Sequence, residues 1–122
     1  MNALHIRALE AAERFVGRKG YEVLDRSWSR EGMAGHIDLV AADDGEIVFI
    51  AVTAADHAED GFAGSAISRE QNEVLAASWL ADNTPEGDVS IRFDAIDMIV
   101  VSESRALLRH HINRYGSAEA TA

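Results

Sequence analysis

The segment spanning residues 36–53 constrains the fold more than any other part of the sequence. Two β-rich stretches, residues 36–42 and 46–53, flank Asp43-Asp44-Gly45, and Asp-Gly is the strongest short signal for a β-hairpin. Residues 47–52 are apolar on both faces, as in a central strand that is covered on each side. The hairpin is therefore expected inside a sheet with helices on both faces.

Two segments show the helical spacing needed to provide this cover. Apolar side chains recur every three or four positions over residues 3–19, and a second apolar face runs through residues 65–83. Residues 21–28 and 89–101 are strand-like, while residues 105–115 fit a helix or a strand. We expect an α/β fold, with a mixed sheet of four or five strands flanked by helices.

The length of the chain sets the number of domains. At 122 residues it fits one hydrophobic core, so we expect a single domain over residues 1–116 and a flexible tail at residues 117–122. No apolar run approaches the ~20 residues of a membrane-spanning helix, and no basic and then apolar leader opens the chain. The expected location is the cytoplasm, without membrane contact. Cysteine is absent, which excludes disulfides and thiolate metal ligands.

Charge is distributed unevenly along the chain, whose formal net charge is −10. Residues 1–30 are mildly basic, with Arg7, Arg14, Arg18, Lys19, Arg26 and Arg30 against Glu10, Glu13, Glu22 and Asp25. Residues 31–68 contain no lysine or arginine, but they contain many carboxylates: Glu31, Asp38, Asp43, Asp44, Glu46, Asp56, Glu59 and Asp60. Because such a segment repels phosphate, weak or no binding of nucleic acid is expected.

The predicted hairpin register brings four small or polar side chains together. With a two-residue turn at Asp44-Gly45, Asp38 stands opposite Ala51. By the same count His36 stands opposite Thr53, and strand alternation puts these four side chains on one face. The other face is expected in the core: Ile37, Leu39, Val48, Ile50 and Val52. A nuclease of the PD-(D/E)XK kind needs two opposed carboxylates for Mg²⁺ at such a position, with a lysine nearby.

Four segments in this order resemble a known family, the YraN-like proteins of bacteria, which share the restriction-endonuclease-like fold. The resemblance spans most of the chain and rests on residues 19–24 (Lys-Gly-Tyr-Glu-Val-Leu), 35–41 (Gly-His-Ile-Asp-Leu-Val-Ala), 48–53 (Val-Phe-Ile-Ala-Val-Thr) and 92–94 (Arg-Phe-Asp). It implies a restriction-endonuclease-like α/β fold here and marks where a nuclease site would lie.

The residues that such a nuclease site requires are replaced in this chain. The family usually reads Gly-Glu-Ile-Asp-Leu-Ile in the second segment, and His36 takes the place of its glutamate. It usually reads Val-Phe-Val-Glu-Val-Lys in the third, where Ala51 and Thr53 replace the glutamate and the lysine. The glutamate of the first helix falls at Leu9, so only Asp38 remains. One carboxylate cannot supply the ligands of a catalytic Mg²⁺. We expect a vestigial site without a catalytic residue or cofactor: His36, Asp38, Ala51 and Thr53.

His36 and Asp38 are also candidate ligands for a transition metal, because both lie on one strand face. Asp56 or His57 from the following loop would complete the shell. No second strong ligand spacing is present in the sequence, so the pattern favours a hydrogen-bonded His–Asp pair over a metal site.

Other conspicuous residues have a structural interpretation. A buried Asp94 that pairs with Arg92 or with a loop amide is favoured over a site residue. We interpret His110-His111 as a solvated pair and expect Trp28 and Trp79 in the core. The basic cluster of the first helix is expected on a solvated face, where it pairs with acids of the same helix: Arg14, Arg18 and Lys19 with Glu10 and Glu13.

Three functions fit these observations. The first is a non-catalytic, nuclease-like protein that binds a protein partner or itself. The second is a divergent nuclease dependent on Mg²⁺, in which other acids replace the lost ones: Glu10, Glu46 or Asp94. The third is a non-catalytic nucleic-acid-binding module that uses the basic first third of the chain. We favour the first, because the motif residues are replaced at His36, Ala51 and Thr53.

Overall fold

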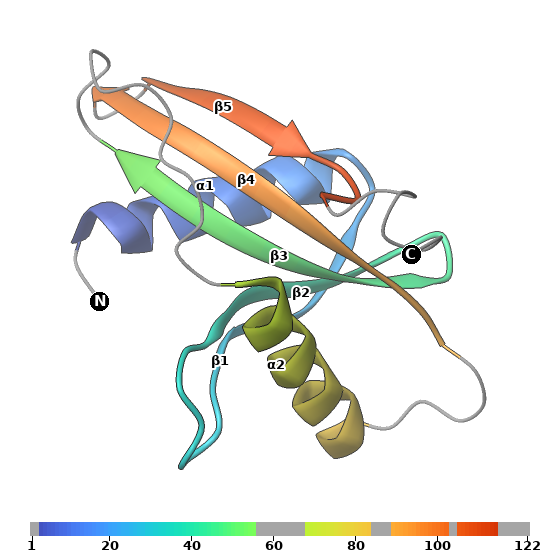
Figure 1. Cartoon of the computed structure of the whole chain (residues 1–122). Helices are drawn as coiled ribbons and strands as arrows, with labels where there is room; N and C mark the ends of the chain where they lie inside the picture. The colour runs from blue at the N-terminus through green and yellow to red at the C-terminus, as the bar shows by residue number, and fades with distance from the viewer. Residues whose placement is uncertain (1–2, 56–67, 84–88, 103–104, 115–122) are drawn as a thin grey trace.

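The computed structural model describes residues 3–55, 68–83, 89–102 and 105–114. In chain order the elements are α1 (Ala3–Arg18), β1 (Glu22–Trp28), β2 (Ile37–Asp43), β3 (Glu46–Ala55), α2 (Arg69–Asp82), β4 (Ser90–Ser102) and β5 (Arg105–His111). The strands form one sheet in the order β1-β2-β3-β4-β5, in which only β3 and β4 run parallel (Figure 1). This confirms the mixed α/β sheet flanked by helices.

Helix α1 covers one face of the sheet. Its small side chains Ala8, Ala12 and Val16 are fully buried and recur every fourth residue, so the helix packs closely on β3. The core on this face also contains side chains from the strands: Leu39, Ala41, Val48, Ile50, Val52, Ile96 and Met98. The helix ends before Gly20, which has φ +96°, a conformation that favours glycine.

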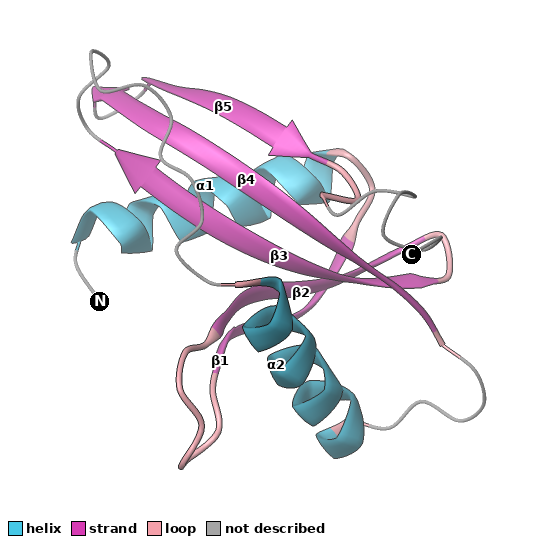
Figure 2. Cartoon of the chain, in the orientation of Figure 1, coloured by secondary structure: helices cyan, strands magenta, loops and turns pink. Residues whose placement is uncertain are grey.

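Helix α2 covers the opposite face, over β1 and β2 (Figure 2). The buried Leu75, Ala76 and Trp79 pack on Ile37, Val40 and Phe49. This confirms Trp79 as a core residue, whereas Trp28 is partly buried at the border of the core. The helix begins later than residue 65, because the Ser68 hydroxyl accepts the Gln71 backbone N–H and forms its N-cap. The two helices provide the cover that the apolar β3 requires.

The hairpin forms with the predicted two-residue turn. Asp44 and Gly45 have φ +50° and +86°, Asp43 pairs with Glu46, and the register continues as predicted to Leu39↔Ile50. Beyond that pair β2 and β3 diverge: β2 stays beside β1, whereas β3 continues beside β4 as far as Ala55↔Ile99 (Figure 1).

The divergence corrects part of the predicted register. Asp38 does not pair with Ala51, and His36 lies before β2 and does not pair with Thr53. Ile37 packs in the α2 core, whereas Leu39 packs in the α1 core, so the expected placement of Ile37 on the face of Leu39 is wrong. The simple alternation fails because it assumes that both strands remain paired to their ends.

The ambiguous segment after residue 104 is an edge strand rather than a helix. β5 pairs antiparallel with β4, from Ser102↔Arg105 to Ala95↔His111. No helix of the described residues is long and apolar enough to cross a membrane. The sequence predicts a loop at residues 54–64, but β3 continues to Ala55. The rest of that segment and the predicted tail at residues 117–122 lie outside the described part of the chain.

Candidate functional site at the divergence of β2 and β3

The site predicted from the sequence lies where β2 and β3 separate. Asp38 is 7 % exposed, and its Oδ2 accepts the backbone N–H of Val52 at 2.8 Å. This side chain bridges the two strands beyond their last paired residues. The hydrogen bond satisfies a buried N–H and fixes the orientation of the Asp38 carboxylate.

The other oxygen of Asp38 contacts two histidines. Oδ1 lies 2.7 Å from Nε2 of His36 and 3.0 Å from Nε2 of His5. The two imidazole rings stand edge to face with their centroids 6.0 Å apart. The predicted pairing of His36 with Asp38 is present, and the fold adds a second imidazole to it.

Sequence reasoning did not identify His5 as a site residue. It lies in the first turn of α1, 33 residues before Asp38, and reaches it only because α1 packs across the sheet. One signal was available: His5 is one helical turn before Leu9, the position at which the family resemblance places a glutamate. Asp56 and His57, the expected completing ligands, lie outside the described residues.

Ala51 and Thr53 stand where the family resemblance places a glutamate and a lysine. Ala51 offers a methyl group, and the Thr53 hydroxyl donates to Asp97 at 2.7 Å. Asp97 also accepts from Arg109 and contacts His111, each at 3.2 Å. Within the described residues, neither an opposed carboxylate nor a lysine for water activation lies beside Asp38, and Mg²⁺ prefers oxygen ligands over imidazole.

Of the acids considered as replacements, Glu46 and Asp94 each form ion pairs of their own. Glu46 bonds Arg92 and Ser90 at the hairpin end of the sheet, and Glu10 lines a groove beside α1. Asp94 lines the same small cavity as Asp38, but its carboxylate is held in a separate hydrogen-bond network. Among the described residues, the only group of three or more histidine or acidic side chains with mutually close ligand atoms is His5, His36 and Asp38.

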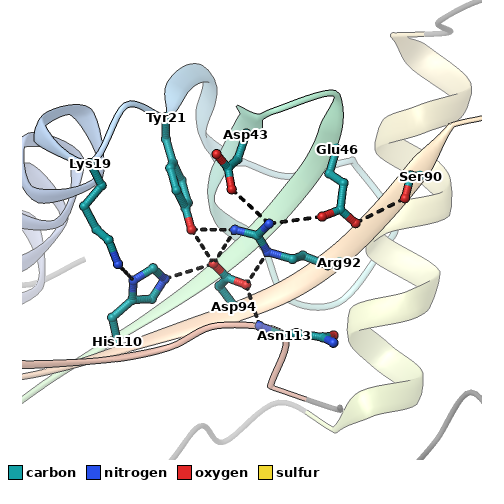
Figure 3. A network of polar contacts seen from close by, with 9 residues as sticks. All are labelled: Lys19, Tyr21, Asp43, Glu46, Ser90, Arg92, Asp94, His110 and Asn113. Atoms are coloured by element: carbon teal, nitrogen blue, oxygen red, sulfur yellow. Dashed lines mark hydrogen bonds and ion pairs between the residues drawn. The ribbon is translucent and has the colours of Figure 1, made fainter. Parts of the chain in front are cut away.

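The separate network is centred on Asp94, which is fully buried (Figure 3). Arg92 donates to it at 3.0 Å, the Asn113 backbone N–H at 2.9 Å, and Nε2 of His110 lies 2.9 Å away. Burial alone would raise the pKa of Asp94, but these hydrogen bonds outweigh it and lower the pKa to about 2. The structural interpretation of Asp94 is confirmed.

Two further members complete this network and correct one prediction. Tyr21 donates to Asp94 at 3.3 Å, and burial together with that carboxylate raises the pKa of Tyr21 to about 12. The His110 side chain is only 5 % exposed, so His110 is not part of a solvated pair; His111 remains 42 % exposed. Edge strand β5 turns His110 inward because alternate residues face opposite sides.

The early basic residues do not form one surface. Arg26 pairs with Glu13 at 2.7 Å, Arg30 pairs with Asp82, and Lys19 contacts His110 at 3.1 Å. Glu13 thus pairs with a strand arginine, not with the helix cations that the sequence suggested. Two of the remaining arginines line a groove of about 250 Å³ between α1 and the β4–β5 hairpin, together with a later one: Arg7, Arg14 and Arg105.

The sheet is mixed, has five strands and carries one helix on each face, and two of its strands diverge at a motif position. This arrangement is consistent with the restriction-endonuclease-like class of α/β proteins. The chain belongs to the uncharacterised protein family UPF0102, whose model matches residues 10–98. A UPF0102 protein of Roseiflexus castenholzii is 34 % identical over 104 residues, which cover 83 % of this chain and 82 % of the relative. One from Frankia alni is 36 % identical over 91 residues, covering 71 % and 72 %. One from Geobacter sulfurreducens is 28 % identical over 114 residues, covering 92 % and 88 %.

Proposed function

We propose that this chain is a non-catalytic, nuclease-like member of its family that acts by binding a protein partner or a second copy of itself. One observation carries the proposal: Asp38 is the only motif acid left, and both of its oxygens are engaged by Val52, His36 and His5. Without a second carboxylate and a lysine, neither the metal nor the attacking water of a nuclease is held.

The edges of the sheet support a role in binding. β1 and β5 are both edge strands, and each exposes an apolar side chain, Leu24 at 43 % and Leu107 at 52 %. Edge strands offer backbone groups that pair with another chain, and exposed apolar side chains add area to such a contact. A protein segment or a second copy of the chain is the kind of partner that fits.

A nuclease assay tests the catalytic half of this proposal. We expect no cleavage of single- or double-stranded DNA or RNA by the purified protein with Mg²⁺ or Mn²⁺. Asp38→Asn is the control, because it keeps an oxygen for the Val52 N–H. Divalent-dependent cleavage that is lost in Asp38→Asn would contradict the proposal and favour the divergent nuclease. Light scattering on the same preparation shows whether a second copy is the partner.

A specific observation favours one alternative, a non-catalytic nucleic-acid-binding module. Arg7, Arg14 and Arg105 line one groove, and none of them forms an ion pair within the described part of the chain. Glu10 lines the same groove and reduces its positive charge. Three guanidinium groups around a groove of this size are suited to a few phosphates of a flexible strand.

A further inference from the structure

The buried aspartates differ in the cations that surround them. Asp38, Asp94 and Asp97 are the buried charged residues of the described chain. Arg92 pairs with Asp94 at 3.0 Å and Arg109 pairs with Asp97 at 3.2 Å, so a guanidinium already neutralises each of these carboxylates. In the described structure, Asp38 contacts no lysine or arginine, only imidazoles and a backbone N–H. Its negative charge is therefore open to another cation.

The donor atoms around Asp38 have a spacing suited to one metal ion. Oδ1 of Asp38 and Nε2 of His5 and His36 all lie within 4.8 Å of one another, with the two N–O distances at 3.0 and 2.7 Å. Ligands of a tetrahedral ion with bonds of about 2.0–2.1 Å are about 3.3 Å apart. Shifts of less than about 1 Å in partly exposed imidazoles would reach that geometry.

We propose that His5, His36 and Asp38 bind a first-row transition-metal dication such as Zn²⁺ at the former nuclease centre. Imidazole nitrogen is a preferred ligand of Zn²⁺, Ni²⁺, Cu²⁺ and Fe²⁺, whereas Mg²⁺ requires oxygen ligands. The same replacement that removes the Mg²⁺ site, a histidine at position 36, supplies a ligand for this second class of ion.

The surroundings hold the carboxylate in place for this role. The Val52 N–H binds Oδ2 of Asp38, which leaves Oδ1 directed at the two histidines, and such a partner behind a ligand is typical of metal sites. His5 and His36 are 23 % and 39 % exposed, so an ion has a path from solvent. A cavity of about 20 Å³ is lined by His36 and Asp38, and also by Asp94, with room for about one water molecule.

The bound ion would join two elements that are far apart in the chain. His5 belongs to the first turn of α1, whereas Asp38 belongs to β2 and His36 directly precedes it. A metal at this point would therefore stabilise the packing of the start of α1 on the sheet. Metal binding at this site is a different property from the absence of cleavage, and it does not require that the protein also binds a macromolecule.

Titration of the full-length, tag-free protein with Co²⁺ tests the site, because tetrahedral Co²⁺ bound to imidazole absorbs visible light. We expect one equivalent to bind, Zn²⁺ to displace it, and Mg²⁺ in excess to leave it bound. His5→Gln, His36→Gln and Asp38→Asn should each weaken Co²⁺ binding at least 10- to 100-fold. His111→Gln is the matched control, because His111 also contacts a buried aspartate but has no second imidazole from the described residues grouped with it. This variant should bind Co²⁺ like the wild type.

Proton NMR of the imidazoles in the wild-type protein identifies the ligands even if a variant fails to fold. Of the five histidines in the chain, Zn²⁺ should shift the ring resonances of His5 and His36 and leave those of His110 and His111 unchanged. Absence of Co²⁺ absorption, equal binding by His36→Gln and the wild type, or displacement by Mg²⁺ would each overturn the proposal.

Discussion

Asp38 and Asp94 show how identical side chains acquire different roles from their surroundings. Asp94 is enclosed by Arg92, Tyr21 and the Asn113 backbone N–H, and it is not exposed at all. A guanidinium neutralises the charge of Asp94, so this carboxylate stabilises the fold and is not available to a ligand. Asp38 has two imidazoles in place of a guanidinium, and imidazole nitrogen is the commonest metal ligand in proteins.

The depressed pKa of Asp94 predicts acid-sensitive stability. Its folded pKa of about 2 lies below the ordinary value of 3.8, so the ionised carboxylate stabilises the fold above pH ~4, and this contribution is lost as the pH falls through ~2. The contribution is on the order of 2 kcal/mol. We expect Asp94→Asn to lower the free energy of unfolding at pH 7 by about 2 kcal/mol and to flatten its fall between pH 5 and 2.

Urea unfolding followed by tryptophan fluorescence at several pH values measures this effect. Ser90→Ala is the control, since it removes a hydroxyl at the border of the same network without changing a titrating group, and it should keep the wild-type pH slope. An unchanged slope in Asp94→Asn would mean that another group causes the acid sensitivity.

At the scale of elements, the sequence predicted best what depends on local chemistry. The Asp-Gly turn, the register from Asp43↔Glu46 to Leu39↔Ile50, and the two covering helices follow from residue types a few positions apart. Packing between distant segments determines three other features: the strand at residues 105–111, the divergence of β2 from β3, and the contact of His5 with Asp38. Two members of the candidate site, His36 and Asp38, were therefore identified from the sequence, but the third, His5 from α1, was not.

The loop before β2 depends on a glycine that contacts α2. Gly32 and Gly35 both have φ +83°, but a Cβ at Gly35 would lie 2.9 Å from Nε2 of Gln71, whereas nothing lies within 4 Å of one at Gly32. Gln71 donates to the Ala34 carbonyl at 3.1 Å and so joins α2 to the residues that precede His36. We expect Gly32→Ala to cost about 1 kcal/mol from backbone strain and Gly35→Ala about 1 kcal/mol more.

The same two substitutions in protein that also carries Gln71→Ala separate the cost of the Gln71 contact from the cost of backbone strain. With Gln71→Ala, the two glycine substitutions should lower the free energy of unfolding equally, because only the strain remains. Equal losses already in the wild-type background would show that Gln71 moves aside without cost.

At the scale of the whole molecule, charge limits what the chain can bind. The formal net charge of −10 repels polyanions, and ion pairs with Glu13 and Asp82 neutralise Arg26 and Arg30. The groove with Arg7, Arg14 and Arg105 is a small basic area on an acidic protein. Long-range repulsion and short-range attraction thus oppose each other, which favours weak contact with a short strand over tight binding of a duplex.

Fluorescence anisotropy measures the affinity of the protein for a short single-stranded oligonucleotide. We expect a Kd of about 10⁻⁴ M at physiological salt and a log–log salt slope of about −2, as for three phosphate contacts on a single strand. The triple change Arg7→Gln, Arg14→Gln and Arg105→Gln should abolish the residual binding, whereas the double change Arg26→Gln and Arg30→Gln should leave it. A nanomolar complex with a steep salt dependence would instead promote the nucleic-acid-binding alternative.

The hydrogen bond between Asp38 and Val52 has an evolutionary consequence. A lineage that stops cutting nucleic acid can replace residues that served only chemistry. Positions 36, 51 and 53 here carry His, Ala and Thr, where the family resemblance places glutamate, glutamate and lysine. Replacing Asp38 would also leave the Val52 N–H buried without an acceptor at the point where the strands part, a loss of about 1–3 kcal/mol. Selection for folding alone is then enough to retain this aspartate after catalysis is gone. In such descendants, a single remaining motif acid is explained by the stability of the sheet, and it is not evidence that the reaction still occurs.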